Sequence, residues 1–131
     1  METADFCSYE LSKRLKDCGF DEPCDHLYNG HGNLNRYADT DRINRNTNGH
    51  HTPSCSAPTL AHAQKWLREV KRCDVTVYAQ PYNGLLFYTG YILFEGDETE
   101  VLDDNGQWFD DYEKALSETI ASALELIKKG E

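Results

Sequence analysis

No stretch of this sequence is long and apolar enough to cross a membrane. A transmembrane helix needs about 18 or more consecutive apolar residues, and the 131-residue chain has no such run. Its first residues also lack the basic start and the apolar centre of a secretory signal. We therefore expect a cytoplasmic protein that has no membrane partner.

Basic residues are scarce. The chain has 13 Lys and Arg against 23 Asp and Glu, which gives a formal net charge of −10. Proteins that bind nucleic acid gain much of their affinity from basic side chains that displace counterions from phosphates. This balance argues against nucleic-acid binding. It fits a solvated acidic surface, a basic protein partner or mimicry of nucleic acid.

Motifs of known chemistry are missing as well. The sequence contains no Cys-x-x-Cys pair, no His-x-x-x-His pair and no glycine-rich phosphate loop. Its five cysteines are an odd set with no sign of export, which favours reduced thiols over a disulfide framework. The sequence therefore indicates no particular reaction, and we expect a non-enzymatic protein without a cofactor.

One group of side chains keeps a metal site open as an alternative. Candidate zinc ligands gather in and beside a polar segment: Cys24, His26, His31, His50, His51 and Cys55. Zinc takes cysteine and histidine ligands in a tetrahedron, and metal binding can order a polar segment. The spacing of these residues is poor for zinc, so we expect solvated loop histidines.

A catalytic cysteine would need an oriented base beside it. Cys55 is close in sequence to two histidines, but this proximity does not orient either of them as a base.

The N-terminal part is predicted to begin with a helix over residues 5–19. Leu11, Leu15 and Cys18 fall on one face of this helix. Gly19 is typical of the residue just past a helix end, where the backbone turns left-handed.

A polar, flexible insert is predicted over residues 24–55. Asn, Gly, His and Thr dominate this segment, which is too polar to offset the entropy lost on ordering. The turn sequence between Tyr28 and Leu34 allows a short hairpin there. Residues 39–53 are predicted to be mobile, and residues 29–53 could order on binding.

Residues 56–131 are predicted to form a core of helix, three strands and helix. The first helix would be capped by Ser56, with Pro58 in its first turn and Trp66 as a core anchor. Alternating or continuous apolar patterns indicate strands over 74–79, 85–94 and 98–102.

The last helix is predicted from a capping box, in which Asp110 pairs with Glu113, followed by a long apolar stripe.

Double-stranded RNA-binding domains share this order of helix, three strands and helix, but they bind phosphates with basic residues where this chain has acidic ones. The sum is an α+β, two-layer single domain over residues 1–131.

One face of the predicted sheet stands out for its aromatic residues. If both helices cover the face that bears Val75 and Val77, the opposite face carries Thr76, Tyr78, Phe87, Thr89 and Tyr91. Either the first helix or the insert covers this face, or the face is open, and an open aromatic face of this size indicates a protein partner or a homodimer.

Two stretches carry a resemblance. Ser-Ala-Pro-Thr-Leu-Ala-His-Ala-Gln-Lys-Trp-Leu-Arg-Glu at 56–69, together with Tyr-Glu-Lys-Ala-Leu at 112–116, resembles a group of short proteins carried by phages and mobile elements of gut bacteria. Gly-Phe-Asp-Glu-Pro-Cys at 19–24 is similar to theirs. The resemblance covers most of the chain except residues 29–53. It implies a bacterial cytoplasm and an accessory role, and it assigns no catalytic residue.

The leading hypothesis is a non-enzymatic accessory protein of a phage or mobile element that binds another protein, or itself, through the open aromatic face. One alternative is an acidic inhibitor of a host nucleic-acid-binding defence protein. The other is a metal-ordered binding module.

Overall fold

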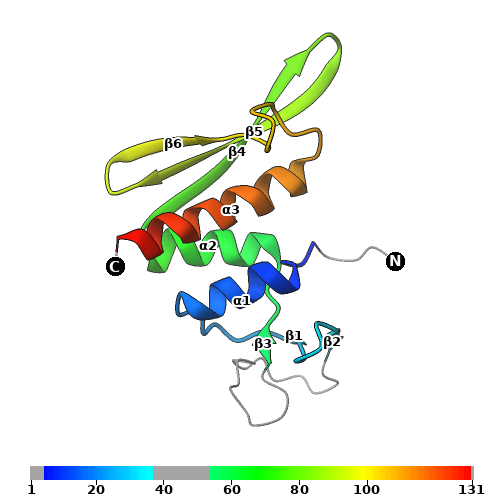
Figure 1. Cartoon of the computed structure of the whole chain (residues 1–131), viewed down its shortest axis with the longest axis vertical. Helices are drawn as coiled ribbons and strands as arrows, with labels where there is room; N and C mark the ends of the chain where they lie inside the picture. Colours follow the sequence, from blue (N-terminus) through cyan, green and yellow to red (C-terminus); the bar gives the residue numbers. More distant parts are fainter. Residues whose placement is uncertain (1–4, 37–53, 131) are drawn as a thin grey trace. The chain divides into compact units, whose positions relative to one another are not determined.

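The computed structural model describes residues 5–36 and 54–130 (Figure 1). The elements follow the chain as α1 (Tyr9–Asp17), β1 (His26–Tyr28), β2 (Leu34–Arg36), β3 (Cys55–Ser56), α2 (Leu60–Val70), β4 (Cys73–Tyr82), β5 (Leu85–Phe94), β6 (Asp97–Val101) and α3 (Tyr112–Lys129). These helices and antiparallel sheets confirm the predicted α+β class. The chain divides into two compact units, one ending at His62 and one beginning at Ala63. The single domain predicted over residues 1–131 stays a prediction.

Clear signals mark both ends of α1 in the first unit. The Ser8 hydroxyl accepts a hydrogen bond from the Leu11 amide at 3.1 Å, as an N-cap does. At the other end Gly19 has a φ of +95°. The amides of Gly19 and Phe20 donate to the carbonyls of Lys16 and Leu15, which is the Schellman pattern. The predicted helix end is confirmed, whereas the helix begins at Tyr9 rather than at residue 5.

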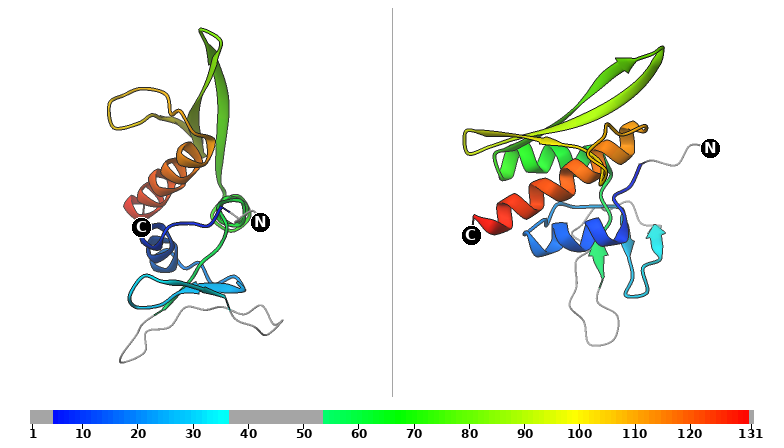
Figure 2. Two further views of the ribbon diagram at one scale, coloured as in Figure 1. Left: turned by 90° about the vertical axis from the view of Figure 1, so that its right-hand side faces the viewer. Right: turned by 45° about the horizontal axis from the view of Figure 1, so that its top comes forward.

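A small sheet follows α1 and corrects the predicted layout. β1 pairs antiparallel with β2 and with β3, in the order β2-β1-β3. Leu27 lies opposite Asn35 on one side and Ser56 on the other, and α1 packs beside this sheet (Figure 2). The layout with one three-stranded sheet and a flexible insert over 24–55 was therefore wrong where the insert is described. Residues 37–53 lie outside the described residues.

The start of α2 also differs from the prediction. Ser56 belongs to β3 and does not cap the helix. The Thr59 hydroxyl accepts from the His62 amide at 3.1 Å and takes that role. The preceding residues are held extended because the Cys7 amide donates to the Pro58 carbonyl at 2.9 Å. A long-range pairing has thus displaced a plausible local cap. Trp66, the predicted anchor, is buried.

The second unit is built on an antiparallel meander in the order β4-β5-β6. Both of its tight turns use two residues with positive φ, Asn83-Gly84 and Glu95-Gly96. This pattern is that of the type I′ turn, whose twist matches the flanking strands. The three predicted strands are confirmed, and β4 extends beyond its predicted end to Tyr82. β6 pairs only with residues 90–94 of β5, so the β4–β5 hairpin reaches beyond it (Figures 1 and 2).

α3 covers one face of this sheet. Its buried side chains are Ala115, Leu116, Thr119, Ile120, Ala123, Leu124 and Ile127. The approach is close at Gly90 of β5, where an added Cβ would collide with the hydroxyl of Thr119 and lie 2.9 Å from its Cβ. The cap is Asp111 rather than Asp110, because its Oδ1 accepts from the amides of Glu113 and Lys114 at 2.8 and 3.2 Å.

Within residues 5–36 and 54–130, none of the helices combines the length and apolar character needed to span a membrane.

Candidate interaction face

The five face residues predicted from the sequence do share one face of the second unit's sheet. Thr76 lies directly opposite Tyr91, and Tyr78 directly opposite Thr89. Residues opposite each other in an antiparallel pair point to the same side. Phe87 follows by alternation. The other side carries Val75 and Ile92, which are fully buried.

We call the side away from α3 the open face. By register it comprises Asp74, Thr76, Tyr78, Gln80, Tyr82, Leu85, Phe87, Thr89, Tyr91, Leu93, Glu98 and Glu100. Several of its large apolar side chains are exposed: Tyr78 by 54%, Tyr82 by 59% and Leu85 by 62%. The Tyr78 and Tyr91 rings meet edge to face with centroids 5.4 Å apart. Exposed aromatic area of this kind is typical of protein interfaces.

Thr89 supports the open face rather than presenting itself to a partner. It is fully buried, and its hydroxyl lies 3.2 Å from Glu100 Oε2. The Tyr91 hydroxyl donates to the same carboxylate oxygen at 3.3 Å. Burial, and then the neighbouring Glu100 carboxylate, raise the pKa of Tyr91, so its phenol stays a donor at neutral pH. These contacts hold the Glu100 carboxylate against Thr89 and Tyr91 of the face.

Sequence reasoning missed the contribution of the loop after β6. Phe109 and Tyr88 exchange two backbone hydrogen bonds of 2.8 Å, so Phe109 lies beside β5 where β6 has ended. This pairing brings Trp108 over the open face, with its ring centroid 6.4 Å from those of Tyr82 and Phe87. No periodic pattern in the sequence predicts this contact, because it depends on where the loop returns to the sheet.

The loop that carries Trp108 is held by one side chain. Asp103 Oδ1 accepts from the amides of Asn105 and Gln107 at 2.8 and 2.9 Å. The backbone of Asp103 adds two further bonds, donating to Gln107 and accepting from Gly106. Between this loop and the open face lies a pocket of about 410 Å³, lined by Tyr82, Phe87, Glu100, Leu102, Gly106, Gln107 and Trp108.

The acidic charge of the protein is concentrated in the segment that forms this sheet and the loop after it. From Cys73 to Glu113 the chain has ten Asp and Glu residues and no Lys, Arg or His. The rest of the chain carries 13 acidic and 13 basic side chains, so the whole net charge of −10 belongs to this segment. The open face thus belongs to the acidic segment of the chain, and the described basic residues nearest to it include Arg68 and Arg72, which line a pocket with its residues Asp74 and Leu93.

No protein family, curated protein or solved structure was found to match this chain. The resemblance to phage and mobile-element proteins therefore stays a prediction.

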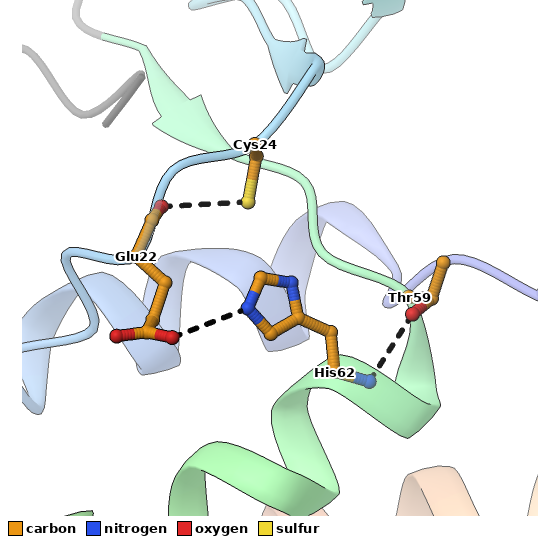
Figure 3. Close-up of polar contacts among 4 residues, drawn as sticks. All are labelled: Glu22, Cys24, Thr59 and His62. Carbon is orange, nitrogen blue, oxygen red and sulfur yellow. Dashed lines mark hydrogen bonds and ion pairs between the residues drawn. The ribbon is translucent and has the colours of Figure 1, made fainter. Parts of the chain in front are cut away.

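A second group of polar side chains lies in the first unit (Figure 3). His62 Nε2 is 3.5 Å from Glu22 Oε1, and the imidazole meets the Phe20 ring with centroids 5.3 Å apart. The Cys24 thiol donates to the Glu22 carbonyl at 3.6 Å, a role that requires the protonated sulfur. The group resembles a nucleophile and its base in composition, but the thiol's bond to the Glu22 carbonyl uses its proton as a donor.

The described candidate metal ligands do not form a metal site. Among the described residues, no three His, Cys, Asp or Glu side chains form a group that could hold a metal ion. His26 pairs with Asp25 at 2.9 Å, and Cys55 is buried on β3, where burial raises the pKa of its thiol. His50 and His51 lie outside the described residues.

The buried thiol of Cys7 should make stability fall at alkaline pH. Burial, with a contribution from Cys24, raises the pKa of Cys7 from 9.0 to about 12. The unfolded chain then loses this proton at lower pH than the folded one, so the stabilisation is complete below pH 9 and declines as the pH rises toward 12. The expected slope is about 1.4 kcal/mol per pH unit.

Urea unfolding at pH 8 to 10.5 measures this slope, and Cys7→Ala should make it shallower by about that amount. An equal slope in both proteins would contradict the prediction. Tyrosines and lysines that titrate in the same range contribute equally to the slopes of both proteins, so the difference between the slopes reports Cys7 alone.

Proposed function

We propose that this protein binds another protein through the open face of its second unit. The observation that carries the proposal is the coincidence of exposed aromatic side chains with the entire net negative charge of the chain. Buried aromatic rings supply most of the energy at the centres of interfaces, and charge complementarity selects the partner and speeds its approach. We infer a partner with a basic surface, and an accessory role that needs no chemistry.

The charge also disfavours the homodimer. Two copies meeting through this face would each bring Asp74, Glu98 and Glu100 to the interface, and the segment Cys73–Glu113 that forms the face contains no Lys or Arg. Like charges at an interface are costly. A separate basic protein therefore fits the face better than a second copy does.

The experiment compares the wild type with Tyr78→Ala plus Tyr91→Ala. Immobilised protein is exposed to a bacterial host lysate, bound proteins are identified, and their affinity for the purified chain is measured. We expect a basic protein whose affinity falls about tenfold or more in the double variant, because interface aromatics are the usual hot spots. Val70→Ala removes apolar area from a residue of similar exposure outside the face, and it should leave binding unchanged.

The same affinity in the double variant would overturn the proposal. Sedimentation of the purified chain tests the homodimer separately, and a monomer is the expected result at micromolar concentration.

The concentration of acidic charge also favours one second candidate, an inhibitor of a nucleic-acid-binding protein. Charge mimicry makes nearly all of the affinity disappear at high salt, whereas an interface whose energy comes mainly from aromatic rings loses only the part that its charges contribute. A salt titration of the captured complex distinguishes the two.

A further inference from the structure

The pocket beside the open face has walls made of aromatic rings. Tyr82 comes from β4, Phe87 from β5 and Trp108 from the following loop. The Trp108 ring stands at 74° to Tyr82 and at 41° to Phe87, with centroids 6.4 Å apart in each case. The three rings are thus tilted around a space and are not stacked flat on one another.

The pocket also contains a single charged lining residue, Glu100. Its carboxylate is held by the hydroxyls of Tyr91 and Thr89 at 3.3 and 3.2 Å, which leaves its position defined before any ligand arrives. No basic side chain lines the pocket, and none lies between Cys73 and Glu113. The described basic residue that shares a pocket with Glu100 is Lys129 of α3, and that is a neighbouring pocket without aromatic walls.

Ring faces and a carboxylate attract the same kind of group. Aromatic faces carry partial negative charge and bind ammonium and guanidinium groups within about 6 Å of the ring centroid. A carboxylate adds direct charge attraction and accepts their hydrogen bonds. An apolar ligand would bury the charge of Glu100 with only two hydroxyl groups to compensate it, which is costly, and an anion would be repelled by it.

We propose that this pocket takes the cationic end of a lysine or arginine side chain from the basic protein that binds the open face. The proposal rests on the proposed function and names the chemical group that anchors the partner. A volume of about 410 Å³ leaves room for the aliphatic stem of the side chain as well as its charged end.

The test needs no partner protein. Nα-acetyl-lysine methylamide and Nα-acetyl-arginine methylamide are titrated into the ¹⁵N-labelled full chain, with Nα-acetyl-norleucine methylamide as the neutral match. We expect the cationic probes to shift the indole N–H signal of Trp108, while the signal of the buried Trp66 stays in place. The neutral probe should bind about tenfold more weakly.

Two variants with a matched control locate the binding. Glu100→Gln keeps the shape of the side chain and removes its charge, and Trp108→Leu removes a ring; each should weaken the cationic probes about fivefold or more. Glu98→Gln makes the same charge change on the same strand and face, outside the pocket. It should change binding less than twofold.

Equal binding of the neutral probe, or equal effects of Glu100→Gln and Glu98→Gln, would overturn the proposal. The first result would mean simple apolar contact, and the second a diffuse attraction to the acidic surface. If Trp108→Leu disturbs the fold, the comparison of Glu100→Gln with Glu98→Gln still tests the proposal.

Selective probe binding without any captured protein would support the cation pocket and count against the proposed function. Capture of a protein without probe binding would support the proposed function and count against the cation pocket.

Discussion

Gly90→Ala should destabilise the second unit by about 3 kcal/mol or more. The added Cβ would collide with the Thr119 hydroxyl and lie 2.9 and 3.0 Å from its Cβ and Cγ2. Thr119 cannot turn away freely, because it is fully buried and its hydroxyl donates to the Ala115 carbonyl at 2.6 Å. Helix and sheet would have to separate. Tryptophan fluorescence during urea unfolding measures the effect, since Trp66 and Trp108 both belong to this unit.

A second substitution tests the cause. Thr119→Ala removes the hydroxyl and the methyl group that the new Cβ would meet, so the double variant should be more stable than Gly90→Ala alone. Gly130→Ala is the matched control, because a Cβ there has only ordinary contacts at 3.6 Å and beyond, and φ is −81°. If the costs of Gly90→Ala and Thr119→Ala simply add, the explanation by close approach is wrong.

Phe20→Ala should destabilise the first unit by about 3 to 5 kcal/mol, the usual cost of truncating a buried phenylalanine. Phe20 is 1% exposed and closes the end of α1 through its amide while its ring contacts His62. Circular dichroism during urea unfolding and amide hydrogen exchange in β1 measure the loss. Leu34→Ala removes a 42% exposed side chain from the same unit and should cost less than 1 kcal/mol. Equal costs for the two variants would contradict the assignment of Phe20 to the core.

The second unit could be predicted well because its signals are local. The strands from Cys73 to Val101 are joined by two-residue turns, so alternation and turn residues indicated their presence and order, although β4 extends past its predicted end at residue 79 to Tyr82. The same alternation would have extended the face from Tyr78 to Tyr82. Trp108 could not be placed in this way, because its position depends on the return of the loop to β5.

The small sheet of the first unit could not be predicted from local patterns. Its strands have two or three residues each, too few to show alternation, and the pairing of Leu27 with Ser56 joins residues far apart in sequence. The same pairing explains the wrong helix cap. Ser56 looked like a cap in its local context, and tertiary structure drew it into β3 instead.

The turn held by Asp103 has a consequence for the kinetics of association. Because the backbone that carries Trp108 is already in one shape, this loop loses little conformational freedom when a partner docks. Such preorganisation lengthens the residence time of a complex more than it speeds its formation. Asp103→Ala should therefore raise the dissociation rate constant of a bound complex, while the association rate constant stays almost the same.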